Sequence, residues 1–395
     1  MRPNVLQLIA SFDQGGSERQ AVQLVRLLHE SGLAQVHVAC LKGGGVLASE
    51  VLRLGLGPVP EFPLSSFYDR NALRQLKRFR SLLSEREIDV VQTHDFYTNV
   101  FGMAGAWMGR VPARVASKRE THGMRTPAQK LVERQVFRLA HRVVVNSEAV
   151  GRQLVSDGVR ASKLVTVYNG LDASRVTPAA GLTRDAMLGS LELPREESRR
   201  FVTIVANLEH EVKDHATFLR AAARVSACVP EAAFVLAGEG RLAEDLRRQA
   251  AELGVGRDTF FTGRCTRVAE LLSVSDVCVL SSRAEGFSNS ILEYMAAGRP
   301  VVVTDVGGAR EAVTEGETGY LVSSGDDRAM AARIVSLLTE PERARAMGER
   351  GRQTIELKFS CEAQLKNTLS LYDELLSRTR PARSRAMEDA PHKGV

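Results

Sequence analysis

The sequence predicts an α/β protein made of two successive domains, each with a parallel β-sheet. Short aliphatic and β-branched runs alternate with helical patterns along most of the 395 residues, which is typical of parallel sheets covered by helices on both faces. The alternation stops near Asn169 and starts again at Phe201. A chain of this length also contains two or three domains, at roughly 150 residues per domain.

The first half carries the pattern of six strands. A helix that begins near Ser17 follows the first strand, keeps its apolar residues on one stripe, and ends at Gly32. The predicted strands are Val5–Ala10, Val36–Leu41, Asp89–Thr93, Arg114–Ser117, Arg142–Asn146 and Leu164–Tyr168.

The second half repeats this organisation. A turn-rich, charged stretch that ends at Arg200 is expected to connect the two domains. We expect domains over residues 1–175 and 176–360, a terminal helix over 361–378, and a disordered tail over 379–395, which lacks apolar periodicity. The six predicted strands are Phe201–Ala206, Ala233–Ala237, Thr259–Gly263, Val277–Ser281, Pro300–Thr304 and Gly319–Val322.

Composition restricts the class of protein. Apolar residues make up 44% and charged residues 25%, which excludes collagen-like and low-complexity chains. The five cysteines are scattered without a C-x-x-C pair, so we expect no disulfide framework or zinc site and a cytoplasmic location. No uncharged apolar run approaches the ~18 residues that span a bilayer, so we expect a soluble or peripheral protein. Residues 1–180 carry a net charge of +9, which suggests an anionic partner for this half.

Two adjacent glycines, Gly15 and Gly16, lie between the first predicted strand and the first helix. Because they have no side chains, they let the backbone approach a ligand closely, and the free N–H groups at a helix N-terminus suit a phosphate. A tight strand-to-helix turn explains the pair equally well.

A second candidate site is the stretch EGFSNSILE, from Glu285 to Glu293. Its two carboxylates are predicted to flank a loop-to-helix junction after the strand Val277–Ser281, where open α/β sheets bind ligands. They could accept hydrogen bonds from hydroxyls at the two ends of a polyhydroxylated ligand, with a phosphate at the amides of residues 287–289. For Glu293, a capping box with Ser290 is an equally good alternative.

Two other loops follow strands of the second domain. Lys213 precedes a helix that begins near Asp214 and could neutralise a diphosphate, although a solvated surface lysine is the commoner explanation. The segment Gly238–Ala243 fits the G-x-G-x-x-A dinucleotide pattern. Asp258 follows at the usual spacing, but it precedes a strand and is therefore misplaced for a ribose. A nicotinamide or flavin cofactor is not expected.

The candidate acid–base groups of the first half are His94, Asp95 and His122, which follow predicted strands. A single histidine is more often structural than catalytic. The sequence contains no H-E-x-x-H, P-loop, G-x-S-x-G or D-x-D motif, which argues against a metalloprotease, a P-loop NTPase and an α/β-hydrolase.

Taken together, these segments resemble the GT-B fold glycosyltransferases, specifically the large retaining group of family 4. The resemblance runs over about residues 4–375 and rests on the order and spacing of short motifs. The matching segments are Gly15-Gly16, Tyr168–Asp172, Lys213–His215, Leu236–Gly240, Glu285–Glu293, and Gly307-Gly308 with Glu311.

The resemblance implies two Rossmann-like domains facing across a cleft, with the acceptor on the first, a nucleotide-activated sugar on the second, and the last helix packed back on the first. It implies that Glu285 contacts the donor sugar, Glu293 the ribose and Lys213 the diphosphate. The implied catalytic candidates are Glu285, Lys213, His122 and His94. The implied donor-binding set is Gly15, Gly16, Asn207, Lys213, Gly238, Glu285, Gly286, Phe287, Ser288, Asn289, Leu292 and Glu293.

The second domain departs from the family pattern at Asn207. The family commonly has an arginine six residues before the lysine, so one cation for the leaving diphosphate is missing here. Arg283 and Arg310 are candidates to replace it.

The first domain departs from the pattern after the strand Arg114–Ser117. The catalytic histidine of the family usually follows this strand directly, whereas here Lys118 or Arg119 stands near that place and His122 comes later.

The implied reaction is a metal-independent, retaining hexosyl transfer from a nucleotide-diphosphate sugar to an acceptor hydroxyl, without a cofactor. We expect a saccharide or polyprenyl-diphosphate-linked acceptor, a role in bacterial cell-surface polysaccharide or glycolipid synthesis, and no nucleic-acid partner. Basic clusters at residues 70–80 and 119–142 either rest on the inner face of the membrane or form solvated helix faces. The alternatives are a UDP-sugar 2-epimerase of the same fold and a GT-B-like binding subunit without turnover.

Overall fold

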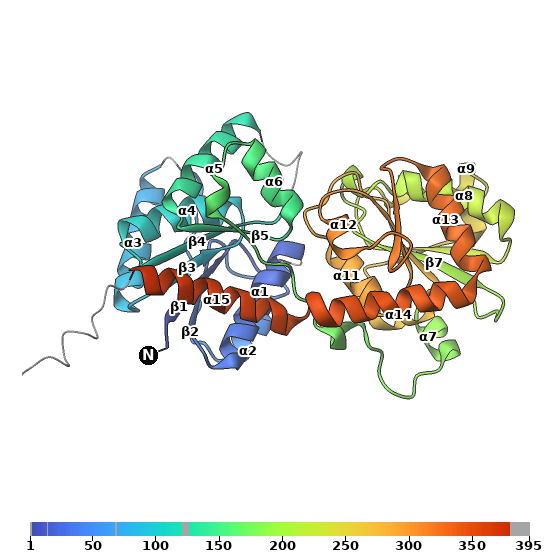
Figure 1. The fold of residues 1–395 in the computed structure, drawn as a ribbon, viewed down its shortest axis with the longest axis horizontal. Helices are drawn as coiled ribbons and strands as arrows, with labels where there is room; N and C mark the ends of the chain where they lie inside the picture. The colour runs from blue at the N-terminus through green and yellow to red at the C-terminus, as the bar shows by residue number, and fades with distance from the viewer. Residues whose placement is uncertain (1, 14, 68, 121–125, 380–395) are drawn as a thin grey trace, which may run out of the picture.

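The computed structural model describes residues 2–13, 15–67, 69–120 and 126–379. Two six-stranded parallel sheets form the centres of two domains that lie side by side (Figure 1). This arrangement confirms the predicted α/β architecture. Residues 380–395 of the predicted disordered tail lie outside the described residues, whereas Thr379 ends the terminal helix.

The first sheet has the strand order β2-β1-β3-β4-β5-β6. In its first five strands along the chain, the Val, Leu and Ile side chains are buried on both faces, because helices cover both sides of a parallel sheet. Leu164 and Val165 of the sixth, an edge strand, are partly exposed. The strands start and end within two residues of their predicted bounds. They are β1 (Asn4–Ile9), β2 (Gln35–Cys40), β3 (Val90–Thr93), β4 (Ala113–Lys118), β5 (Arg142–Val145) and β6 (Leu164–Thr166).

Helices of the first domain begin and end at residues that suit those positions. Gly32 ends the first helix with a left-handed φ of +62°, and Asp95 and Thr126 cap the fourth and fifth helices with their side chains. The helices are α1 (Gly16–Ser31), α2 (Ala48–Arg53), α3 (Arg70–Glu85), α4 (Phe96–Met108), α5 (Pro127–Leu139) and α6 (Glu148–Ser156).

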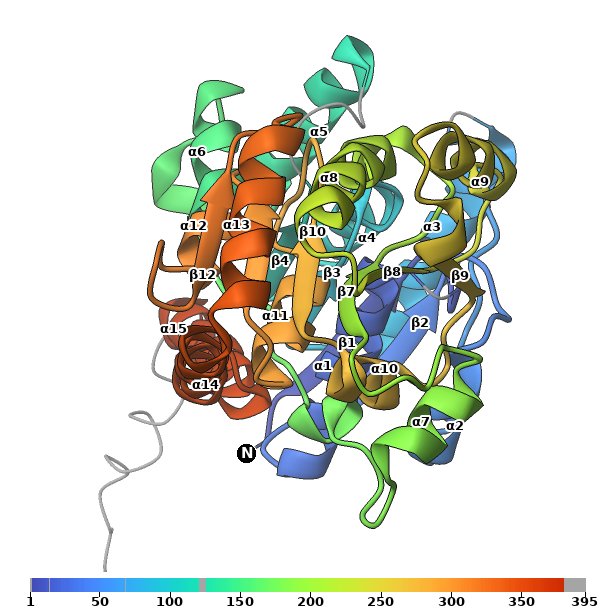
Figure 2. The same ribbon diagram turned by 90° about the vertical axis from the view of Figure 1, so that its right-hand side faces the viewer.

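The second sheet has the order β12-β11-β10-β7-β8-β9. In the turned view, α8 and α13 lie side by side over this sheet (Figure 2). The strands are β7 (Arg200–Val205), β8 (Ala232–Ala237), β9 (Thr259–Gly263), β10 (Val277–Leu280), β11 (Val301–Thr304) and β12 (Gly319–Val322). The helices between them are α8 (His215–Cys228), α9 (Ala243–Glu252), α10 (Val268–Val274), α11 (Asn289–Ala296) and α12 (Ala309–Ala312), and α13 (Asp327–Thr339) follows the last strand.

The connection between the domains is more ordered than predicted. The stretch expected to consist of turns contains the helix α7 (Arg184–Ser190). Thr183 caps this helix, and Met187 and Leu188 pack in an apolar cluster with Phe201 of β7. A short amphipathic helix with few apolar residues gives a weak periodic signal, and the long-range packing that stabilises it is not visible in the local sequence.

The last two helices lie along one side of the molecule. α14 (Pro341–Lys358) lies along the second domain and α15 (Cys361–Thr379) along the first (Figure 1). On α15, Leu371 packs in the core of the first domain, and the Tyr372 hydroxyl accepts a hydrogen bond from Gln7 Nε2 at 3.0 Å and donates one to Gln92. No helix in the described part of the chain combines the length and apolarity needed to cross a bilayer.

Candidate active site

A cleft of about 530 Å³ lies between the two domains. The loops that line it follow β1, β4, β5 and β6 of the first domain and β7 and β10 of the second, as expected for open α/β sheets, which bind ligands beyond the carboxyl ends of their strands. A larger groove of about 660 Å³ along β9 and α9 contains none of the predicted site residues. The predicted donor-binding residues that line the interdomain cleft are Gly16, Asn207, Lys213, Glu285, Gly286, Phe287, Ser288 and Asn289.

Lys213 and Glu285 meet in this cleft. Lys213 Nζ lies 2.6 Å from Glu285 Oε1, and Ser282 Oγ donates to the same carboxylate oxygen at 2.6 Å. Asp214 follows with a left-handed φ of +46° and caps α8 with its side chain. The loop that carries Lys213 follows β7, and the loop that carries Glu285 follows the neighbouring strand β10, so the sheet itself brings the pair together.

The N-terminus of α11 points to the same cleft. Ser288 is the N-cap residue and makes no side-chain capping bond, so backbone N–H groups of the first turn remain for a ligand. The capping box of Ser290 with Glu293 is wrong: Ser290 lies inside the helix, and its Oγ donates to the Val205 carbonyl at 2.9 Å. Tertiary contact with β7 overrides the local capping pattern.

Glu293 is buried beside a cation of the other domain. Its side chain does not line the cleft but lies 3.9 Å from Arg19 Nη1 of α1. Burial raises the pKa of Glu293, and the nearby Arg175 and Arg19 oppose this rise. Glu293 therefore lies at the interface between the domains, one turn inside α11.

Three other residues of the predicted donor set have structural positions outside the cleft lining. Gly15 is the N-cap of α1, and Leu292 is fully buried in the core of the second domain. A Cβ on Gly238 would lie 2.0 Å from the carbonyl oxygen of Ala206, so glycine is needed for the close approach of two loops.

His94 lies in the core of the first domain and not in the cleft. It is 2% exposed, and its Nε2 lies 2.7 Å from Gln7 Oε1. Burial holds the pKa of His94 well below its usual range, so the ring is neutral. This placement argues against His94 as an acid–base group for a ligand in the cleft. The other candidate, His122, lies outside the described residues.

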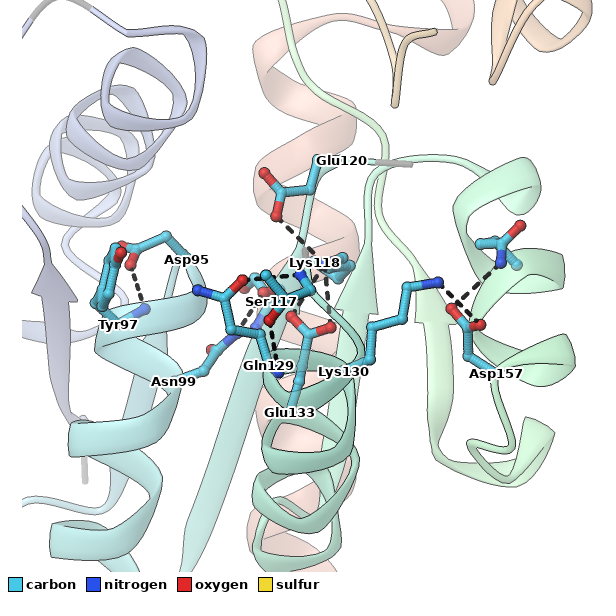
Figure 3. A network of polar contacts seen from close by, with 12 residues as sticks. Asp95, Tyr97, Asn99, Ser117, Lys118, Glu120, Gln129, Lys130, Glu133 and Asp157 are labelled. Carbon is cyan, nitrogen blue, oxygen red and sulfur yellow. Dashed lines mark hydrogen bonds and ion pairs between the residues drawn. The ribbon is translucent and has the colours of Figure 1, made fainter. Parts of the chain in front are cut away.

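The end of β4 sends two basic side chains to opposite sides, because successive residues of a strand face opposite ways. Lys118 Nζ donates to both carboxylate oxygens of Glu133 at 3.0 and 3.1 Å and to Glu120 at 3.3 Å (Figure 3). Arg119 instead lines the cleft, and its Nη1 donates to Asn169 Oδ1 at 2.7 Å. Arg119, which directly follows β4, is therefore the basic residue at this end of the strand that lines the cleft, and Lys118 is not.

Asn169 connects Arg119 to both helix N-termini. Its Nδ2 donates to Asn289 Oδ1 at 2.9 Å, at the start of α11. A Cβ on Gly16, at the start of α1, would lie 3.5 Å from Asn289 Nδ2. The positive ends of α1 and α11 thus meet in one small region, next to a guanidinium group.

Three further residues of the cleft lining were not predicted from the sequence to have a role in the site: Arg119, Asn146 and Asn169. Asn146 also lines the cleft, donates to the Arg119 carbonyl at 3.1 Å, and has a buried Oδ1 without a hydrogen-bond partner among the described residues. The available signal was position: each of the three follows shortly after a strand, on the ligand-binding edge of the sheet.

The two arginines proposed to replace the cation missing at Asn207 are engaged elsewhere. Arg283 Nε lies 3.1 Å from Asp214 Oδ2. Arg310 Nε donates a hydrogen bond to Asp305 Oδ2 at 2.8 Å. Both compensation hypotheses are therefore wrong for the geometry seen here. Within the described lining of the cleft, the lysine and arginine side chains are Lys213 and Arg119.

Contacts between the domains hold the cleft together. Glu311 of α12 accepts hydrogen bonds from the backbone N–H groups of Glu148 and Ala149 at 2.7 and 2.9 Å, so the second domain caps α6 of the first. Ser147 Oγ donates to the Gly286 carbonyl at 3.1 Å. These contacts explain why the segment Gly307-Gly308 with Glu311 belongs to the recognised pattern. Across residues 2–13, 15–67, 69–120 and 126–379, no group of three His, Cys, Asp or Glu side chains is arranged to bind a metal.

Comparison with known protein families gives a consistent result. Residues 14–175 match the model of Glycosyltransferase Family 4, and residues 191–354 match that of Glycosyl transferases group 1. The chain is 36% identical over 160 residues to the "Putative glycosyltransferase EpsD" of Bacillus subtilis, covering 40% of this chain and 42% of that protein. It is 32% identical over 232 residues to the "N-acetyl-alpha-D-glucosaminyl L-malate synthase" of Bacillus anthracis, covering 58% and 59%. The matches thus span about half the length of these relatives.

A solved structure supports the same fold. The Anabaena protein Alr3699/HepE, solved in complex with UDP, superposes with a TM-score of 0.82 at 19% identity, over 95% of this chain and 100% of that one. The same protein has also been solved with UDP-glucose. The chain therefore belongs to the GT-B fold glycosyltransferases, with a family 4 domain followed by a group 1 domain.

Proposed function

We propose that this protein is a retaining glycosyltransferase that moves a hexosyl group from a nucleoside-diphosphate sugar to an acceptor hydroxyl held by the first domain. The observation that carries this proposal is the Lys213–Glu285 pair at the N-terminus of α11. A cation, a carboxylate and free backbone N–H groups converge there on one cleft. Such a donor offers a partner to each: diphosphate oxygens to the cation and the N–H groups, and sugar hydroxyls to the carboxylate.

The charges of the site fit the chemistry of this transfer. The bond between the sugar anomeric carbon and the diphosphate oxygen breaks through an oxocarbenium-like transition state, and the electron pair passes to the leaving diphosphate. Lys213 and the N-termini of α1 and α11 stabilise that growing negative charge. In a retaining transfer of this kind, the acceptor hydroxyl attacks from the face of the leaving group, and the departing phosphate takes its proton. No pair of catalytic carboxylates is then required.

The donor base is proposed to be uracil, because the structural neighbour from Anabaena was solved with UDP and with UDP-glucose. Glu293 is proposed to accept hydrogen bonds from the ribose hydroxyls, since it is the buried carboxylate one turn inside α11. The proposed reaction needs neither a resident cofactor nor a divalent metal.

We propose that the acceptor is presented at the inner face of a membrane, as a saccharide or polyprenyl-diphosphate-linked saccharide of cell-surface polymer synthesis. α3 supports this proposal. Its exposed face carries Leu73, which is 62% exposed, among basic residues that make no ion pair within the described part of the chain. Trp107, 57% exposed, lies at the end of α4, which packs against α3. Basic and large apolar side chains together suit an anionic lipid surface. The basic residues of this α3 face are Arg70, Arg74, Lys77 and Arg80.

A nucleotide-sugar panel tests the proposed function. The full-length protein is incubated with UDP-, GDP- and ADP-linked sugars, with and without a membrane lipid extract, and free nucleotide and the anomer of the product are measured. Release of one nucleoside diphosphate, with an α-linked product from an α-linked donor, is expected. Conversion to a 2-epimer would favour the epimerase, which the comparisons do not favour. Binding without release would indicate a subunit that has lost turnover.

A further inference from the structure

We propose that Arg119 is the second cation that binds the donor diphosphate, supplied by the first domain in place of the arginine that the second domain lacks at Asn207. This inference rests on the proposed function, because it assumes a nucleoside-diphosphate donor in the cleft. It adds a side-chain cation of the first domain to the helix N-termini and to Lys213, which the proposed function already places at the leaving group.

The backbone position of Arg119 is fixed by the domain interface. A Cβ on Gly286 would lie 1.9 Å from the Arg119 carbonyl oxygen, so the loop after β10 approaches the end of β4 at a distance that only glycine permits. Asn146 Nδ2 also donates to this carbonyl at 3.1 Å. Arg119 is thus held directly beside the loop that carries Glu285.

The guanidinium group of Arg119 lies where a diphosphate is expected. Its Nη1 donates to Asn169, which hydrogen-bonds Asn289 in the first turn of α11. A Cβ on Gly16, at the start of α1, would lie 3.5 Å from Asn289 Nδ2. Two helix N-termini and one guanidinium group therefore surround a single region, and each of the three attracts an anion.

Arg119 also has hydrogen-bonding capacity to spare. A guanidinium group carries five N–H donors. Across the described residues, one of its nitrogens bonds Asn169, its Nε is buried without a partner, and no carboxylate is hydrogen-bonded to it. Its neighbour Lys118 differs, because it is paired with Glu133 at 3.0 Å.

The charge of Arg119 persists in this environment. Burial lowers the pKa of Arg119 to about 10, and Glu18 partly opposes that effect, so the group stays protonated at neutral pH. A desolvated cation without a bonded carboxylate is unfavourable until an anion arrives. A diphosphate supplies that anion, and a planar guanidinium can bind two of its oxygens at once.

The test compares a nucleoside diphosphate with its nucleoside. UDP and uridine are titrated into the full-length wild type and into the variants Arg119→Gln, Arg119→Lys and Asn169→Ala by calorimetry. We expect Arg119→Gln to weaken UDP binding about 10- to 100-fold and to leave uridine binding unchanged. Arg119→Lys should recover part of the loss because it keeps the charge. Arg138→Gln, which removes an exposed arginine of α5, is the matched control and should bind UDP as the wild type does.

Asn169→Ala separates binding of the diphosphate from support of the Asn169–Asn289 contact. It removes that contact but keeps the cation. If Arg119 only orients Asn169, Arg119→Gln and Asn169→Ala should lose equal affinity for UDP, and Arg119→Lys should recover none of that affinity. This result would overturn the inference. Equal UDP binding by Arg119→Gln and the wild type would also overturn it. If the wild type binds neither UDP nor GDP nor ADP, the proposed function fails first, so the two failures are distinguishable.

Discussion

The two domains share one architecture, but a basic surface helix of the first domain and one that lies along the second differ in how their positive charges are paired. On α14, Arg352 bridges Glu349 at 2.7 Å and Glu356 at 2.8 Å, and the arginines near its start also pair with carboxylates. On α3, none of the basic residues makes an ion pair within the described part of the chain, and those residues are Arg70, Arg74, Lys77, Arg78 and Arg80.

The sequence explains the contrast between these helices. α14 places a glutamate three or four residues from Arg345 and Arg352, a spacing at which side chains of one helix meet. α3 has no acidic residue before Glu85, its last residue. The same difference recurs in the cleft, where Lys213 of the second domain is paired with Glu285 and Arg119 of the first has no bonded carboxylate. In the first domain, we therefore expect an external anion at Arg119 and at the basic face of α3, whereas in the second domain Lys213 meets the diphosphate while paired with Glu285.

The largest effect is expected from the paired cation of the second domain. Lys213→Ala should lower kcat/KM by on the order of 10²–10³, because it removes one group that stabilises the charge of the leaving diphosphate. Steady-state kinetics with the donor identified by the panel provides the measurement. Arg224→Ala, which removes a surface arginine paired with Asp327, serves as the control. If Lys213→Ala keeps near wild-type turnover, Lys213 has only a structural role, as the ion-pair partner of Glu285.

Removing charge from α3 and from α14 tests the contrast on the outer surface. A variant with glutamine at 74, 77 and 80 should bind vesicles of phosphatidylcholine with one-third phosphatidylglycerol about 100-fold more weakly, at about 1 kcal/mol per basic residue. The α14 variant with glutamine at 343, 345 and 352 should bind almost as the wild type does. Vesicle sedimentation measures both, and equal losses from the two helices would remove the proposed membrane contact.

The two carboxylates of the second domain should separate binding from turnover. Glu293→Gln should weaken donor binding roughly tenfold, because an amide makes weaker hydrogen bonds to the ribose hydroxyls than a carboxylate does. Glu285→Gln should lower kcat more than it raises KM, since its partner is the reacting sugar. Calorimetry and kinetics on both variants measure this split. Unchanged nucleotide affinity in Glu293→Gln would assign that residue to the interface with Arg19 alone.

The smallest effect concerns the contact that joins the domains. Glu311→Ala should lower the thermal unfolding midpoint by roughly 2–4 °C, because α6 loses the carboxylate that caps its N-terminus from the other domain. Differential scanning calorimetry measures the change. Glu317→Ala gives the comparison, because the side chain of this exposed residue of the same domain makes no hydrogen bond or ion pair within the described part of the chain. Equal stability of the two variants would contradict the capping role.

Much of the fold was accessible from the sequence because its signals are local. Buried Val- and Ile-rich runs such as Val301–Thr304 predict parallel strands, and Gly32 predicts the end of α1. The segment around Glu285 was recognised because the motif and its position after β10 agree.

The rest depends on contacts between distant residues. The local sequence around Ser290 fits a capping box, but the Ser290 hydroxyl donates its hydrogen bond to the distant carbonyl of Val205 instead. The choice between Lys118 and Arg119 depends on which side of β4 each faces, and a shift of one residue reverses it. The capping role of Glu311 is not visible in the local sequence, because the N–H groups that it accepts from belong to α6 of the other domain.

The most direct test of whether Lys213 and Arg119 together bind the diphosphate is how much more tightly the protein binds UDP than uridine. Calorimetric titrations with UDP and uridine would compare the wild type with the double variant Lys213→Ala/Arg119→Gln. If Lys213 and Arg119 both bind the diphosphate, the wild type is expected to bind UDP at least about 100-fold more tightly than uridine. The double variant should lose most of this difference while its uridine affinity stays the same. A double variant that keeps the full difference would contradict the account, because the diphosphate would then be held by other groups.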